Sequence, residues 1–128
     1  MSTTYGKQRI ARGKATIAQL NAGLVIAPGI GERSIIVNSA SCRAIGGAVT
    51  AVTTIDLQST NGTPVVAATF AQAQLTQNTL LEVPATGTTM GAGWNTELGL
   101  GDGLKLIKNG VDIATATHVE YIVGYTVV

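Results

Sequence analysis

Charged side chains are scarce in this sequence. Lys, Arg, Asp and Glu make up 12% of its 128 residues, against ~25% in soluble domains generally. Hydrophobic residues make up 45% and the mean hydropathy is +0.33, which excludes a disordered chain because disorder requires low hydropathy and high charge. The length suits one folded domain. A surface with so few charges gives a chain little means of staying apart from its neighbours, so we expect a homo-oligomer or a large protein partner.

Cysteine and histidine occur once each, as Cys42 and His118. A lone cysteine excludes an intramolecular disulfide and, with it, a disulfide-stapled scaffold. One cysteine and one histidine cannot supply the four ligands of a zinc site, and the acidic residues lack the spacing of a calcium loop. The sequence therefore predicts neither a metal site nor a cofactor.

Candidates for catalysis are correspondingly few. His118 is the only histidine base, and with Glu120 two residues later it is interpreted as the polar, solvated face of a strand. Cys42 is interpreted as a buried, unreactive thiol, because the adjacent Arg43 would point to the opposite face. The glycine-rich stretches 29–31 and 99–103 lack the spacing of phosphate-binding loops and are typical of turns. We predict no catalytic residues, no small-molecule substrate and no enzymatic activity.

Long apolar runs are also missing. No stretch of 18 uncharged apolar residues occurs, so we expect no transmembrane helix and no membrane partner. The N-terminus has no apolar segment ahead of a small-residue cleavage site. We therefore expect synthesis in the cytoplasm without export by a signal peptide.

Alternation of apolar and polar residues is what the sequence does have. It runs for ten residues from position 118 and again over 49–58, and period-two alternation predicts half-buried strands. Asn61-Gly62 predicts a hairpin with a type I′ turn, which needs positive φ at both residues. Helix signal is confined to one turn at 71–75. Seven or so strands without βαβ spacing predict an all-β, antiparallel sandwich or barrel; the remaining strand candidates are 15–20, 34–44, 65–70, 79–83 and 104–108.

One of these strand candidates is apolar on both sides. Within 34–44, Ile35 and Val37 oppose Ile36 and Cys42. A strand that is apolar on both sides is typical of burial on both faces. We interpret one of these faces as a boundary between subunits.

Positive charge is concentrated at the N-terminus. Residues 1–31 contain four basic residues and no acid. The sequence predicts a basic arm over 1–14 ahead of a single domain over 15–128. Nucleic-acid binding is disfavoured, because four cations are few and the rest of the chain offers no basic face or stacking aromatics. A solvated arm and an arm that docks on an acidic protein surface remain open; the candidate contact residues are Tyr5, Lys7, Arg9, Arg12 and Lys14.

Four segments resemble small virion proteins of tailed bacteriophages. They are NGTPVVA at 61–67, FAQAQLT at 70–76, GDGLK at 101–105 and TATHVEY at 115–121, and the similarity extends from about Ile35 to Val128. The resemblance implies a β-sandwich of jelly-roll type that acts as a capsid decoration, or cement, protein. Such proteins sit on the outer surface of the virion, often as dimers or trimers, and clamp neighbouring subunits of the major capsid protein.

Two further functions stay open beside capsid stabilisation. A tail, collar or fibre-base component of the virion would share the same sequence features. A carbohydrate-binding sandwich would need a platform of exposed aromatics on which sugar rings stack, and the chain has only five aromatic residues. If the arm acts in a capsid, we expect its cations to contact an acidic capsid surface.

Overall fold

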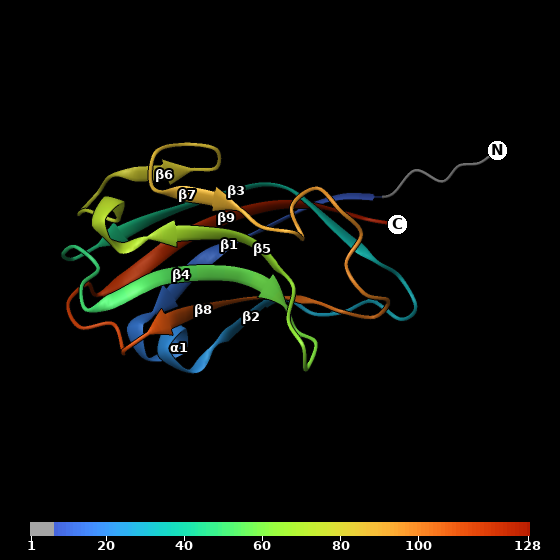
Figure 1. Ribbon diagram of the computed structural model, residues 1–128, viewed down its shortest axis with the longest axis horizontal. Helices are drawn as coiled ribbons and strands as arrows, with labels where there is room; N and C mark the ends of the chain where they lie inside the picture. Colours follow the sequence, from blue (N-terminus) through green and yellow to red (C-terminus); the bar gives the residue numbers. More distant parts are fainter. Residues whose placement is uncertain (1–6) are drawn as a thin grey trace.

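The computed structural model describes residues 7–128, apart from the side chains of Lys7 and Thr53. Its elements are β1 (Lys7–Thr16), α1 (Ile17–Ala22), β2 (Leu24–Ala27), β3 (Ile35–Ile45), β4 (Val52–Ser59), β5 (Val66–Ala71), η1 (Gln72–Gln74), β6 (Leu80–Glu82), β7 (Thr88–Met90), β8 (Leu104–Gly110) and β9 (His118–Val127). The strands form a four-stranded sheet, β1-β9-β3-β6, and a five-stranded sheet, β2-β8-β4-β5-β7, which lie one behind the other in Figure 1. All named strand pairs are antiparallel. The predicted all-β sandwich is confirmed, and its jelly-roll character stays a prediction.

The core fills the space between the two sheets. Each sheet turns one face inward, so alternate residues of each strand meet those of the other sheet. Phe70 on β5, opposite Ile55 on β4, is the largest side chain in the fully buried set. Aliphatic residues make up the rest of the largest buried side chains: Leu20, Ile35, Ile55, Leu57, Leu75, Leu104, Leu106, Val37, Val49, Val119 and Val123.

Strand β9 lies in the middle of the four-stranded sheet. It pairs with β1 along one side and with β3 along the other, over its whole length. The alternation predicted for this segment is confirmed, since Val119, Val123, Tyr125 and Val127 are buried. Tyr121 on the same face is half-buried, and Ile122, an apolar residue on the opposite face, is 41% exposed.

The predicted basic arm is a strand from residue 7 onward. Lys7–Thr16 pairs with β9 through ten consecutive positions, so the expected boundary between an arm at 1–14 and a domain at 15–128 is wrong for residues 7–14. Pairing with β9 supplies backbone hydrogen bonds to a segment poor in strand-forming side chains. Its small residues Ala11 and Ala15 meet the core. Tyr5 lies outside the described residues.

A short helix replaces the strand predicted over 15–20. Thr16 ends β1 and caps α1: its Oγ1 accepts from the Gln19 N–H at 3.1 Å, and Gln19 Oε1 accepts from the Thr16 N–H at 2.9 Å. This reciprocal pair is a capping box, and it starts a helix despite β-branched residues nearby. The single turn predicted at 71–75 is confirmed as η1. No helix in residues 7–128 is long and apolar enough to cross a bilayer.

The predicted hairpin between β4 and β5 is confirmed, but its turn is not of type I′. The two strands pair antiparallel, whereas neither Asn61 nor Gly62 has a positive φ. The connection is a longer loop over 60–65. Within it Asn61 Oδ1 accepts from the Thr63 N–H at 2.8 Å, and this side-chain turn replaces the tight two-residue reversal.

Candidate functional site

The structure divides the predicted contact residues between the two sides of β1. Arg12 and Lys14 are in register with Ile122 and Glu120 on the solvent side of β9, whereas Arg9 is in register with the buried Tyr125. An odd separation along a strand places side chains on opposite faces. Arg9, Arg12 and Lys14 are all exposed, and only the backbone of Lys7 is described. The cations therefore do not form one continuous patch.

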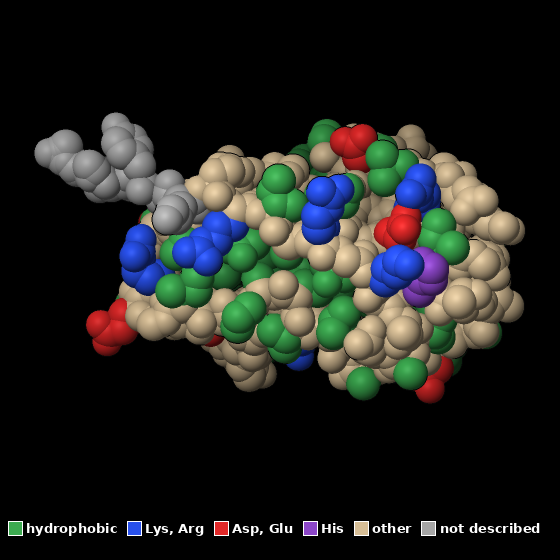
Figure 2. Space-filling view, turned by 180° about the vertical axis from the view of Figure 1, so that it is seen from behind, with side chains coloured by type: hydrophobic (Ala, Val, Ile, Leu, Met, Phe, Trp, Pro, Cys, Tyr) green, Lys and Arg blue, Asp and Glu red, His purple; other side chains and the backbone are tan. Residues whose placement is uncertain are grey.

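The solvent side of the four-stranded sheet, which we call the outer face, brings Arg12 and Lys14 together with residues of other strands. Figure 2 shows this face as mostly uncharged, with hydrophobic side chains scattered over it and with basic side chains and an acidic one gathered beside the histidine at one end. Glu120 on β9 lies between Lys14 on β1 and Arg43 on β3 in the strand register. The outer face thus carries a short charged row on a weakly polar background.

An ion pair joins β9 to β3 within this row. Arg43 Nη2 lies 2.6 Å from Glu120 Oε1, and Arg43 Nε donates to the same oxygen at 3.0 Å. These hydrogen bonds lower the pKa of the Glu120 carboxyl below its ordinary value, and the positive charges of Arg43, His118 and Lys14 act in the same direction. Glu120 therefore stays ionised to lower pH than a free glutamate.

We expect Arg43→Met to raise the pKa of Glu120 toward its ordinary value, because the substitution removes the hydrogen bonds that favour the carboxylate. Because the pKa of Glu120 is lower in the folded state, the ion pair contributes its full stabilisation above the ordinary glutamate pKa of about 4.3. This stabilisation is lost as the pH falls through the pKa of Glu120 in the folded protein. Carbon NMR of the Glu120 carboxyl against pH measures the shift. Lys108→Met, which breaks the Lys108–Asp112 pair at 3.3 Å, is the control; an unchanged Glu120 titration in Arg43→Met would contradict the assignment.

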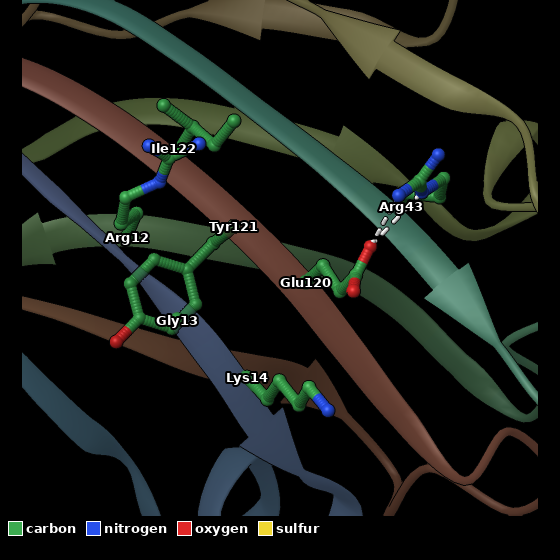
Figure 3. Close-up of a pocket in the computed structure, with 7 residues that line it drawn as sticks. All are labelled: Arg12, Gly13, Lys14, Arg43, Glu120, Tyr121 and Ile122. Carbon is green, nitrogen blue, oxygen red and sulfur yellow. Dashed lines mark hydrogen bonds and ion pairs between the residues drawn. The ribbon is translucent and has the colours of Figure 1, made fainter.

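A hollow adjoins the charged row between β1 and β9. It has a volume of about 290 Å³ and is lined by Arg12, Lys14, Arg43, Glu120 and Ile122, together with Gly13 and Tyr121. Figure 3 shows that Ile122 and Arg12 lie side by side while Arg43 and Glu120 are joined across the strands. Burial raises the pKa of Tyr121 above its ordinary value. The hollow combines positive charge with an exposed apolar side chain.

Two smaller hollows continue across the outer face toward β6. They have volumes of about 180 and 270 Å³ and share Ser41, Leu80 and Ile122. Leu80 is 52% exposed, and Glu82 lines the second of these hollows. The outer face is therefore an uneven surface with exposed apolar side chains on β9 and β6 and at least one charged residue on each of its four strands.

Cys42 and His118 occupy positions that suit structural roles. Cys42 is fully buried on the opposite side of β3 from Arg43, and burial raises the pKa of its thiol to about 12; the predicted buried thiol is confirmed. His118 is half-buried, and its Nε2 atom is buried without a hydrogen-bond partner among the described residues. The predicted placement of His118 and Glu120 on one face is confirmed, although Glu120 bonds to Arg43.

Residues 7–128 contain no group of three His, Cys, Asp or Glu that could hold a metal ion. Comparisons of the chain with family models, curated proteins and solved structures gave no match. The statements that the chain binds no cofactor and has no enzymatic activity remain predictions.

The sequence did not predict that four further residues line adjoining hollows on one surface. They are Ile122, Leu80, Arg43 and Glu82. Ile122 carried a usable signal, because it is an isoleucine on the polar side of an otherwise regular alternation. Exposed apolar side chains mark an interaction surface where several lie together, and here Leu80 lines the same two hollows as Ile122. Arg43 and Glu82 carried no such signal, since their approach depends on the pairing of β3 with β9 and β6.

Proposed function

We propose that the chain is a structural virion protein of a tailed bacteriophage. In this role it decorates the outside of the assembled head and bridges subunits of the major capsid protein. The observation that carries the proposal is a two-sheet sandwich with a weakly charged open face, bordered by a strand that presents basic residues. The resemblance of residues 35–128 to phage decoration proteins supports the same role. A jelly-roll-like fold and a homo-oligomer belong to this proposal.

Strand β1 is the proposed contact with the capsid. Its exposed cations Arg9, Arg12 and Lys14 lie along one border of the sandwich, where they can reach an acidic surface without disturbing the core. Lys7 and Tyr5 precede them in the chain. Binding that is specific for the assembled lattice stabilises it by mass action, in proportion to ln(1 + [L]/Kd). Because many sites repeat over a head, a modest affinity at each site is enough.

Virion location tests the proposal directly. We expect density for the chain on the outer surface of intact particles in cryo-electron microscopy. Density at the tail, collar or fibre base would replace the head assignment with the alternative virion role. The absence of the chain from purified particles would overturn both.

A charge reversal tests the role of β1. We expect Arg9→Glu to reduce binding to undecorated heads about tenfold at low salt, because border charges act mainly through long-range attraction that salt screens. Lys105→Glu makes the same charge change on β8 of the other sheet and should leave binding unchanged. Occupancy is measured by cosedimentation with heads over a concentration series. Equal loss in both variants, or loss in neither, would remove β1 from the contact.

Carbohydrate binding receives no support from the aromatic residues. Phe70 is fully buried and Tyr125 is 8% exposed, while Trp94 and Tyr121 are partly buried against the core. Sugar recognition by stacking needs flat aromatic faces open to solvent. Among the described residues these side chains do not form such a platform.

A further inference from the structure

The outer face carries opposite charges at its two borders. One row of side chains crosses the four strands and consists of Arg12, Ile122, Ser41 and Glu82. In the strand register Arg12 on β1 pairs with Ile122 on β9, Ile122 pairs with Ser41 on β3, and Ser41 pairs with Glu82 on β6. The row ends are three strand spacings apart, about 14 Å, which is too far for Arg12 and Glu82 to form an ion pair within one molecule. Both residues are exposed, and neither is in an ion pair with another described residue.

The neighbouring row has a second charge pattern. Lys14, Glu120, Arg43 and Leu80 follow one another across β1, β9, β3 and β6. The two central residues form the ion pair already described, so the row presents an acid on β9 and a base on β3. Leu80 at its end is 52% exposed. In both rows, two residues that lie equally far from the middle of the sheet, one on each side, differ in charge or polarity. Arg12 corresponds in this way to Glu82, and Glu120 to Arg43.

We infer that the outer face binds a second copy of the chain, face to face, about a two-fold axis that runs along the strands between β9 and β3. This operation places β1 of each copy over β6 of the other and β9 over β3. Arg12 then faces Glu82 of the second copy, and symmetry repeats the contact. In the neighbouring row Glu120 faces Arg43 of the second copy. The exposed Leu80 faces the hollow beside Lys14.

This arrangement matches the physical requirements of an interface. Two sheets can pack with their strands nearly aligned, and the least charged part of the face, around Ile122 and Ser41, falls at the centre. The two Arg12–Glu82 pairs then lie at the borders, where interfaces are ordinarily polar, while Glu120 and Arg43 lie on the central strands. A uniformly acidic partner would meet Glu82 and Glu120 with like charge, whereas a second copy offers an opposite charge at each. Charge complementarity therefore favours a second copy as the occupant.

The inference rests on the proposed function and names a partner for the same molecule. It assigns Arg12 and Lys14 to the contact between copies instead of to the capsid contact. Arg9 lies on the other side of β1 and is left for the capsid. The two roles are separable by experiment, because an Arg12–Glu82 contact is reciprocal between copies and a capsid contact is not.

The test is a charge swap read by analytical ultracentrifugation of the full chain. We expect a dimer for the unaltered protein, and an increase of about 100-fold in the dimer dissociation constant for Arg12→Glu or Glu82→Arg, because each change places like charges together at two symmetric contacts. The double variant, Arg12→Glu with Glu82→Arg, should restore dimerisation to within about threefold. Lys105→Glu, on β8 of the other sheet, and Glu32→Arg, in the loop between β2 and β3, are charge-matched controls and should not alter the constant.

Each result decides the inference. Restoration by the double variant supports it, even if the chain proves to be absent from phage heads. A monomer at the highest soluble concentration overturns it, as does a dimer that neither single variant weakens. Weakening by both single variants without rescue, or equal weakening by the controls, shows that the contact is not reciprocal and also overturns it. Circular dichroism confirms that these substitutions leave the fold intact.

Discussion

Replacing Phe70 with alanine should lower the free energy of unfolding by about 3–5 kcal/mol. Phe70 is fully buried on β5 and is the only phenylalanine in the chain. Its ring occupies the space between the sheets, where Ile55 is its cross-strand neighbour. Alanine removes most of the buried apolar surface and leaves a cavity that the surrounding sheets can close only partly. Tyr125 is the only other aromatic residue among the buried core residues, so the aliphatic neighbours of Phe70 must fill the cavity.

Urea unfolding followed by Trp94 fluorescence measures this loss, since Trp94 is partly buried against the core. Leu100→Ala is the control, because Leu100 is 73% exposed and its truncation should change stability by no more than about 0.5 kcal/mol. Similar losses in the two variants would show that Phe70 is not central to the core. A changed denaturant slope in Phe70→Ala would instead indicate a change in the compactness of the native or unfolded state.

The alternating strands were predictable because one face of each is buried and the other is not. In β9 the burial of Val119, Val123 and Val127 follows directly from period two. In β3 the same reasoning gave the wrong result. Ile35 and Val37 are buried before position 38, whereas Ala40 and Cys42 are buried after it.

A bulge explains the error in β3. The register with β9 shifts between Val37 and Ser39, and one extra residue in a strand moves every later side chain to the other face. The composition of the strand had indicated burial on both faces, and this prediction is wrong. Ile35, Val37, Ala40 and Cys42 all point into one core, and Ile36 on the opposite face is half-buried. Bulge positions depend on the partner strand, which the local sequence does not specify.

The candidate site was predictable only in part. The clustering of basic residues in the sequence correctly drew attention to Arg12 and Lys14, but it also grouped them with Arg9, which β1 places on its opposite side. Their actual neighbours, Glu120 and Ile122, are more than a hundred residues away in the chain. Long-range strand pairing creates the outer face, so spacing along the sequence carries no information about it.

Replacing Gly29 with alanine should destabilise the protein by about 2–3 kcal/mol. A Cβ atom at this position would overlap the backbone carbonyl oxygen of Gly101, because the loop after β2 packs directly on the loop before β8. The Gly101 N–H also donates to the Arg33 carbonyl oxygen at 2.9 Å, so the two loops are tied and cannot separate freely. The backbone itself must therefore move to admit a methyl group.

Gly62→Ala is the matched comparison for this prediction. Gly62 also lies in a loop, where an added methyl group would meet no atom within 4 Å, and its φ is not positive. Both substitutions reduce the freedom of the unfolded chain equally, which alone stabilises by about 0.4–1 kcal/mol. The difference between their urea midpoints therefore isolates the native-state overlap at Gly29. Equal stabilities would show that the loops at this end of the sandwich yield easily, and their close packing would then contribute nothing to its rigidity.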